Sequence, residues 1–199
     1  MSTTAEKVRE LRDKTGAGVM DCKEALAASG EDLEKAVDFL RKKGLASASK
    51  RAHRQARDGV VSAYIHAGAK LGVLIEVNCE TDFVARTEQF QDLVKGLGMQ
   101  VAAASPRWVS REEVPDDIIE REREIYRQQM ADQKKPPQVL DKIIEGKLAK
   151  FYEEACLVDQ VYIRDAGGKL RVADLIAQVS AQTGEKVAVR RFVRFQVGE

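Results

Sequence analysis

The chain has 199 residues, of which 44% are hydrophobic and 33% charged, and its formal net charge at pH 7 is +1. This balance favours one or two globular domains with a real core and disfavours a strongly basic nucleic-acid-binding domain. The sequence contains no apolar run near the roughly 20 residues that span a bilayer, and no signal-peptide core at its start. Three widely separated cysteines, Cys22, Cys79 and Cys156, disfavour a disulfide framework. We therefore expect a soluble cytoplasmic protein.

Residues 1–45 are interpreted as a module of three short helices. Thr3 and Glu6 have the spacing of a capping box, which predicts the start of the first helix. Gly16 is expected to end that helix, and a second helix begins near Gly18. Gly44 is expected to end the third helix, whose apolar residues have the i, i+3, i+4, i+7 spacing of a buried stripe: Leu33, Ala36, Val37 and Leu40.

The turn between the first two helices carries two apolar residues, Val19 and Met20, directly after a pair of glycines. A bundle this small cannot easily bury both side chains. Two interpretations are open. The side chains pack in the core or at its rim, or they form an apolar contact patch for a partner helix.

Residues 46–58 are interpreted as a basic linker. Cations accumulate around it with no acid before Asp58: Arg41, Lys42, Lys43, Lys50, Arg51, Arg54 and Arg57. Such a stretch can bind RNA phosphates, or it can be a solvated connector between domains. No aromatic residues are interleaved with the cations to stack on bases.

Residues 59–199 are interpreted as a core of α+β class, in which an antiparallel sheet packs with helices. Val60–His66 predicts a strand, and a turn leads from it to a second strand whose alternate residues face a core: Leu71, Val73, Ile75, Val77 and Cys79. The strand then runs into a corner at Glu80–Val84, where helical spacing begins. Thr81 or Asp82 can cap the turn that follows.

Helices make up most of the remaining core. A helix from about Thr87 to Ser105 carries a buried stripe of Phe90, Leu93, Val94, Leu97 and Val101. Two further helices, separated by Pro136 and Pro137, predict an antiparallel helical hairpin over about 115–156. A strand over Val161–Arg164 and a helix that ends at Thr183 and Gly184 are also expected.

The last predicted strand alternates over residues 187–197. One face carries Val187, Val189, Arg191, Val193, Phe195 and Val197, and the other carries Arg190, Phe192, Arg194 and Gln196. We expect the second face to be an outer surface, available to a partner or to a dimer, or else an ordinary solvated sheet face.

The sequence contains little that suggests chemical catalysis. His53, His66 and the cysteines are isolated, without the short spacings of a zinc site. The stretch from Gly16 to Lys23 does not match a phosphate-binding loop. Three acids, Glu76, Glu80 and Asp82, could form a cluster for acid–base work or Mg²⁺, which would make the protein a small Mg²⁺-dependent enzyme. A binding or regulatory protein without cofactor or metal is the favoured interpretation.

Four stretches of the chain, taken together, resemble the elongation factor Ts family. They occur in the family's order and spacing: Thr15–Leu26 (TGAGVMDCKEAL), Leu40–Gly44 (LRKKG), Glu76–Ala85 (EVNCETDFVA) and Phe192–Glu199 (FVRFQVGE). The resemblance implies an N-terminal module similar to ubiquitin-associated domains, followed by a short, single-core form of the exchange factor that dimerises. It also implies a guanine-nucleotide exchange factor for elongation factor Tu, with no chemical catalysis. No direct binding of nucleotide or specific nucleic acid is expected.

The resemblance also implies roles for particular residues. Thr81, Asp82, Phe83 and Val84 match the segment that displaces Mg²⁺ from the partner, with Asp82 and Phe83 entering its nucleotide domain near the metal. Arg12, Val19 and Met20 match positions that contact a helix of the same domain, although the family often has a second methionine where Val19 stands. The last strand lies in the part that looks toward the partner's other domains. An RNA- or ribosome-binding protein acting through the basic linker is the alternative.

Overall fold

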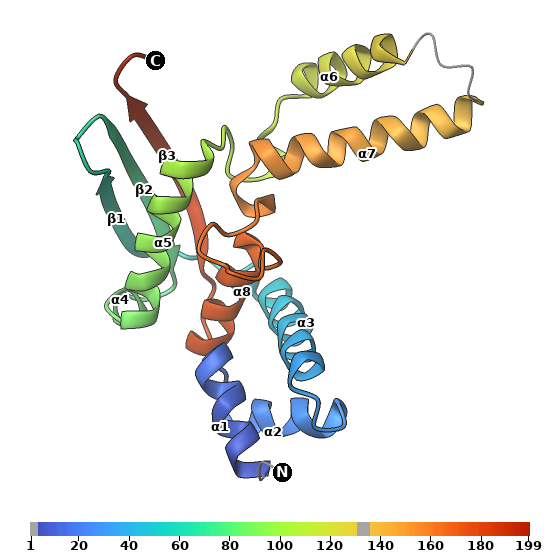
Figure 1. Ribbon diagram of the computed structural model, residues 1–199. Coiled ribbons are helices and arrows are strands. Elements are labelled where there is room, and N and C mark those ends of the chain that lie inside the picture. Colours follow the sequence, from blue (N-terminus) through green and yellow to red (C-terminus); the bar gives the residue numbers. More distant parts are fainter. Residues whose placement is uncertain (1–3, 131–135) are drawn as a thin grey trace. The chain divides into compact units, whose positions relative to one another are not determined.

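The computed structural model describes residues 4–130 and 136–199 and has the predicted α+β class (Figure 1). Thr3 of the expected capping box, and residues 131–135 within the expected helical hairpin, lie outside the described residues. The chain forms two compact units. Unit 1 contains Met1–Ser62, Ile75–Gly96 and Ala173–Arg191, and unit 2 contains Ala63–Leu74, Leu97–Val172 and Phe192–Glu199.

The predicted N-terminal helices are present and have a core of their own. They are α1 (Thr4–Thr15), α2 (Val19–Ala28) and α3 (Leu33–Arg51). Their shared apolar core is formed by Val8, Leu11, Cys22, Ala25, Leu26 and Ala36. The carboxylate of Asp32 begins α3 by accepting a hydrogen bond from the Lys35 N–H (3.1 Å), which satisfies one of the unpaired donors at a helix start.

Gly44 does not end the third helix, so that prediction was wrong. Helix α3 continues to Arg51, and Gly44 is buried within it. A Cβ atom at Gly44 would lie 3.9 Å from the backbone oxygen of Ala177 in α8 (Val172–Thr183). The small residue thus serves a close approach between two helices rather than a helix end. The predicted boundary between residues 45 and 46 falls inside this helix.

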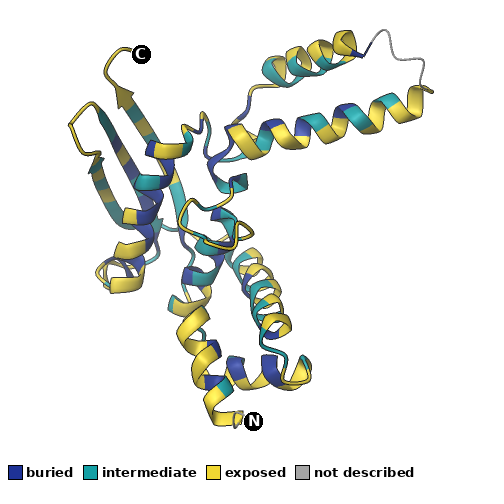
Figure 2. Cartoon of the chain, viewed as in Figure 1, coloured by how far each residue is buried: buried dark blue, intermediate teal, exposed yellow. Residues whose placement is uncertain are grey.

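The sheet has three antiparallel strands in the order β1-β2-β3. They are β1 (Asp58–Ile65), β2 (Leu71–Cys79) and β3 (Ala188–Gln196). The predicted inward face of β2 is confirmed for Val73, Ile75, Val77 and Cys79, which are all buried (Figure 2). Helix α5 (Glu88–Ala104) packs on this side, where a Cβ on Gly98 would lie 3.1 Å from the Tyr64 Cβ atom.

The two faces of the last strand are the reverse of the prediction at its C-terminal end. Phe192 and Arg194, expected to face outward, are partly buried, and the Arg194 Nε donates to the Ala102 carbonyl (3.4 Å). That carbonyl belongs to the last turn of α5, where backbone oxygens have no partner within the helix. Phe195 and Val197, on the other face, are 70% and 71% exposed.

The helical hairpin is confirmed by contacts between α6 (Asp116–Gln129) and α7 (Pro137–Ala155). Met130, Ile144 and Leu148 form a buried cluster between them. Arg123 on α6 pairs with Glu145 on α7 (3.1 Å). The hairpin therefore has an apolar seam of its own within unit 2. Two 3₁₀ turns, Arg111–Glu113 and Leu157–Asp159, flank it.

Residues Val161–Arg164 do not form the predicted strand. Val161 makes only an isolated bridge with Arg171. The buried amide of Gln100 donates to the Val161 carbonyl (3.2 Å) and accepts from the Ile163 N–H (2.8 Å). A side chain on α5 thus satisfies the backbone groups that a neighbouring strand would otherwise pair.

Gly59 provides a test of this packing. Its φ is +140°, and a Cβ atom there would lie 2.2 Å from the backbone oxygen of Val77 in β2. We expect Gly59→Ala to lower the free energy of unfolding by about 2–4 kcal/mol, because the backbone of β2 cannot move aside without disturbing the sheet.

The control is Gly146→Ala in the interior of α7, where an added Cβ meets open space. It should raise the free energy of unfolding by about 0.5–1 kcal/mol. Equal effects of the two substitutions in urea unfolding would contradict this account of Gly59.

Candidate functional site

The corner after β2 presents one large aromatic side chain to solvent. Helix α4 (Asp82–Ala85) is a single turn that begins where Thr81 Oγ1 accepts a hydrogen bond from the Val84 N–H (3.4 Å). The predicted capping role of Thr81 is therefore confirmed. Val84 points inward and is buried, whereas Phe83 is 79% exposed. One turn thus fixes itself to the core by its third residue and projects its second residue outward.

The acids around this corner are each paired separately. Asp82 forms an ion pair with Arg86 (2.8 Å), and both side chains are exposed. Glu80 accepts from the Lys186 N–H (2.6 Å) and pairs with Arg54 (3.3 Å). The Lys186 hydrogen bond, followed by the Arg54 contact, holds the pKa of Glu80 below its usual range.

These pairings argue against the acid cluster considered from the sequence. Glu76 lies apart from the other two acids, with Arg191 at 2.7 Å, and that hydrogen bond lowers the pKa of Glu76. A general acid requires the opposite shift. Within residues 4–130 and 136–199, no group of three or more histidine, cysteine or acidic residues is arranged to hold a metal ion.

One residue that holds the corner was not found from the sequence. Glu185 follows α8, and its carboxylate accepts from the N–H groups of Glu80 (3.0 Å) and Thr81 (3.1 Å) and from the Thr81 hydroxyl (2.7 Å). More than 100 residues separate the partners. The only local signal was the helix end at Thr183 and Gly184, which precedes an acid able to accept hydrogen bonds.

The N-terminal candidates are on the surface of the same compact unit as the corner. Met20 is 74% exposed, and Val19 and Arg12 are exposed as well. Packing of both side chains in the core is therefore wrong; packing at its rim stays a prediction for Val19, which is 43% exposed. Cys22, Ala25 and Leu26 fill the core side of α2 instead. The structure leaves two apolar side chains at the start of α2 accessible to a partner.

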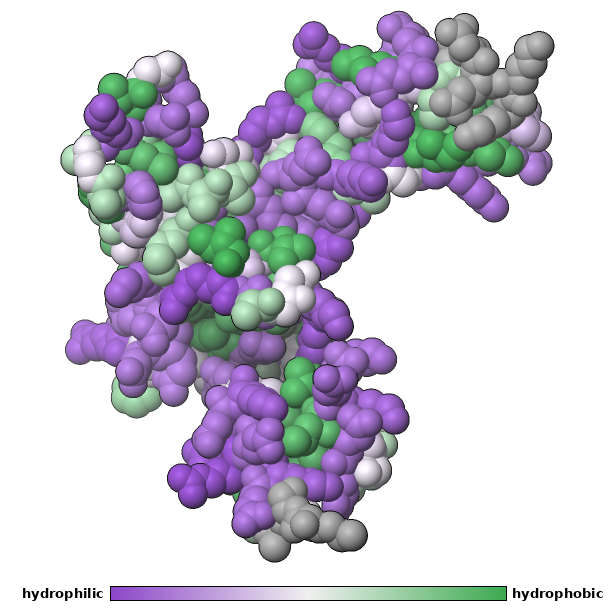
Figure 3. All heavy atoms as spheres, viewed as in Figure 1, coloured by the Kyte–Doolittle hydropathy of each residue, from purple (hydrophilic) through white to green (hydrophobic). Residues whose placement is uncertain are grey.

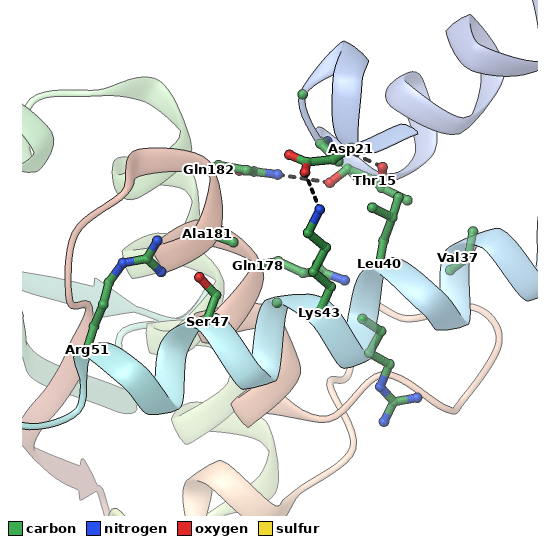
Figure 4. A pocket seen from close by; sticks show the side chains of 14 residues that line it. Thr15, Asp21, Val37, Leu40, Lys43, Ser47, Arg51, Gln178, Ala181 and Gln182 are labelled. Atoms are coloured by element: carbon green, nitrogen blue, oxygen red, sulfur yellow. Dashed lines mark hydrogen bonds and ion pairs between the residues drawn. The ribbon is translucent and has the colours of Figure 1, made fainter. Parts of the chain in front are cut away.

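A cavity of about 280 Å³ lies between α3, α8 and the start of α2 (Figure 4). Lys43 reaches Asp21 (2.7 Å) and Glu24 (2.6 Å) beside it, and the Gln182 amide donates to the Thr15 carbonyl (2.9 Å). The two Lys43 ion pairs join α3 to α2, and the Gln182 hydrogen bond joins the end of α1 to α8. Because these polar groups pair with each other, the cavity is a packing feature within unit 1.

Several cations of the basic stretch are engaged within the protein. Arg41 pairs with the buried Asp174, Lys43 pairs with acids of α2, and Arg54 pairs with Glu80. Residues up to Arg51 also belong to α3 rather than to an extended connector. RNA binding through residues 46–58 stays a prediction; of the three paired cations, only Arg54 lies in that range, and its pairing leaves the linker one fewer free charge. No helix among the described residues is both long and apolar enough to cross a membrane.

Comparison with known proteins gives a match over nearly the whole chain. The sequence pattern of the family described as Elongation factor TS matches residues 6–199. The curated relatives include Elongation factor Ts of Thermodesulfovibrio yellowstonii, 54% identical over 100% of this chain and 98% of the relative. The protein of the same name from Fervidobacterium nodosum is 53% identical over 100% of both chains, and that of an Anaeromyxobacter species is 55% identical over 98% and 88%.

These matches place the chain among the translation elongation factors. Within that class, it belongs to the elongation factor Ts family. The resemblance drawn from four short stretches is therefore confirmed over the whole sequence.

The exposure of Phe83 can be tested by stability alone. Phe83→Ala should change the free energy of unfolding by less than about 0.5 kcal/mol, because the ring loses almost no buried contact. Phe90→Ala is the matched control, since Phe90 lies in the next helix, α5, and is fully buried. That substitution should cost about 3–5 kcal/mol. A large loss of stability in Phe83→Ala would mean that the ring belongs to the core.

Proposed function

We propose that this protein is a cytoplasmic guanine-nucleotide exchange factor that binds elongation factor Tu with GDP, displaces Mg²⁺ and promotes GDP release during translation elongation. The family match over residues 6–199 carries the proposal. The 79% exposure of Phe83 on an anchored turn supports it, because a partner can reach that ring. The protein acts by binding, without chemical catalysis and without a cofactor or metal of its own.

The mechanism proposed here uses differential binding. In a GTPase, Mg²⁺ bridges the phosphates of the nucleotide and neutralises much of their charge. A factor that stabilises a partner conformation with displaced metal ligands therefore weakens GDP binding. Packed interiors change between discrete arrangements, so an inserted aromatic ring can switch them. The coupling is reciprocal: a factor that weakens GDP binding has its own binding weakened by GDP to the same extent, and incoming GTP expels the factor in the same way.

Four consecutive residues divide this task. Thr81 caps the turn, and Val84 fastens it to the core. Phe83 is the wedge, and burial of its ring against the partner contributes about 2–3 kcal/mol. Asp82 enters with it and places a carboxylate beside the Mg²⁺ site of the partner. A short turn held at both ends loses little conformational freedom on binding.

Other surfaces provide the grip. Arg12, Val19 and Met20 are exposed and are proposed to contact a helix of the same partner domain. The last strand is proposed to face the partner's remaining domains. This distribution separates residues that hold the partner from the residues that displace the metal.

A homodimer is the proposed state of the protein. One face of the sheet carries exposed apolar side chains in unit 2: Ile65, Leu74, Val193, Phe195 and Val197. Figure 3 shows the opposite side of the sheet, where α5 covers the strands; this apolar face is turned away from the reader. Exposed apolar side chains in such number on one sheet face favour contact with another surface. A second copy of this face, which is the same on both partners, can cover it by two-fold symmetry.

Exchange is tested by the rate at which a fluorescent GDP analogue leaves elongation factor Tu in stopped-flow experiments. The wild-type protein should accelerate release, and Phe83→Ala should lower that acceleration about 30-fold or more, which corresponds to the loss of roughly 2 kcal/mol. Gln89→Ala, at an exposed position at the start of α5, is the control and should behave as wild type. An unchanged rate with Phe83→Ala would remove the wedge from the mechanism.

Dimerisation is tested by sedimentation equilibrium. Phe195→Asp should raise the dissociation constant of the dimer at least about 100-fold, because a carboxylate would be buried without a partner. Val139→Asp places the same charge on an exposed apolar position of α7 and should leave the association unchanged. A wild-type protein that sediments as a monomer would refute the dimer while leaving the exchange experiment valid.

A further inference from the structure

Glu185 holds the first part of the corner from a distant place in the chain. The residues it binds, Glu80 and Thr81, lie after the end of β2, where the strand no longer pairs with its neighbours. Their N–H groups therefore need other acceptors. One carboxylate oxygen of Glu185 accepts from both N–H groups (3.0 and 3.1 Å), and the other accepts from the Thr81 hydroxyl (2.7 Å).

The attachment is reciprocal. The Lys186 N–H donates back to the Glu80 carboxylate (2.6 Å). The Lys186 ammonium group donates to the carbonyls of Ala52 (2.6 Å) and Arg54 (2.9 Å), just beyond the end of α3. Two consecutive residues after α8 thus fasten both the corner and the segment that follows α3. A charged acceptor makes such hydrogen bonds stronger than neutral ones.

The same hydroxyl has two roles. Thr81 donates to Glu185 and accepts from the Val84 N–H, which begins the turn that carries Phe83. The donation to Glu185 directs the hydroxyl hydrogen away from α4 and leaves a lone pair toward Val84. The carboxylate of Glu185 is therefore linked, through one side chain, to the start of the turn that projects the ring.

From this geometry, we infer that Glu185 is a positioning residue for exchange, holding Thr81 so that Phe83 is delivered in one orientation. The inference rests on the proposed function. Without the carboxylate, the corner samples several arrangements, and only a fraction of them can insert the ring. The maximal rate of GDP release then falls in proportion to that fraction. Glu185 touches neither partner nor nucleotide in this scheme. The initial binding through Arg12, Val19 and Met20 is therefore unaffected.

The test measures GDP release from elongation factor Tu over a range of factor concentrations. Glu185→Ala should lower the maximal rate about tenfold, while the concentration that gives half of that rate changes less than about twofold. Glu185→Gln should recover most of the rate, because its amide oxygen accepts from both N–H groups and its NH₂ donates to Thr81 Oγ1. Glu154→Ala, at an exposed glutamate of α7, is the control and should match wild type.

Two results would overturn the inference. One is a wild-type maximal rate in Glu185→Ala. The other is a Glu185→Gln rate as low as that of Glu185→Ala, which would assign the effect to charge rather than to hydrogen bonding. A simple loss of folded protein would instead scale the effective concentration and leave the maximal rate intact.

A measurement without elongation factor Tu separates this inference from the proposed function. Amide hydrogen exchange by NMR should accelerate at least about tenfold at Glu80 and Thr81 in Glu185→Ala, and stay unchanged in the buried residues of β2. If Glu185→Ala does not fold, Glu185→Asp gives the same comparison, because its carboxylate is one methylene too short to reach both amides. Unchanged protection at both amides would reject the positioning role. If wild type fails to release GDP while protection is lost as expected, only the proposed function is refuted.

Discussion

At the end of a central strand, the backbone leaves the sheet while its N–H and C=O groups still need hydrogen-bond partners. Here that place is Glu80 and Thr81, and the acceptor is a carboxylate from the other end of the chain. Satisfying those two N–H groups fixes the path into α4. The direction of Phe83 and the burial of Val84 both depend on that path. The exchange role proposed above, in which one ring is inserted into a partner, needs this rigidity more than it needs reactive groups.

Charged side chains also join separate segments of the chain. The near-neutral total conceals many cations, and several of them are engaged by the protein's own acids and carbonyls. Arg41 with Asp174 and Lys43 with Asp21 fasten the first helices to each other and to α8. A basic stretch that looks available for RNA in the sequence is therefore partly a set of internal attachments. The exposed candidate surfaces carry large apolar side chains: Met20, Phe83 and Phe195.

Sequence reasoning predicted what short-range periodicity determines. The alternation in β2, the stripe of α5 and the helical hairpin all follow from side-chain spacing, and the cap at Thr81 follows from residue type. It failed where a distant segment decides the local outcome. Gly44 looked like a helix end, but α8 needs the space; Val161–Arg164 looked like a strand, but Gln100 takes its hydrogen bonds. The role of Glu185 could not be predicted for the same reason, since its partners lie more than 100 residues away.

The cysteine at the end of β2 gives the molecule a built-in reporter. Cys79 is fully buried, and its thiol donates to the carbonyl of Thr81 (3.1 Å), directly beneath the corner. Burial, with the nearby acids Glu185 and Asp58, raises the pKa of this thiol to about 11, so almost no reactive thiolate exists at neutral pH. Alkylation of Cys79 therefore requires the corner to open first. The rate of Cys79 alkylation therefore measures how often the corner opens, in the wild-type protein and without an attached label.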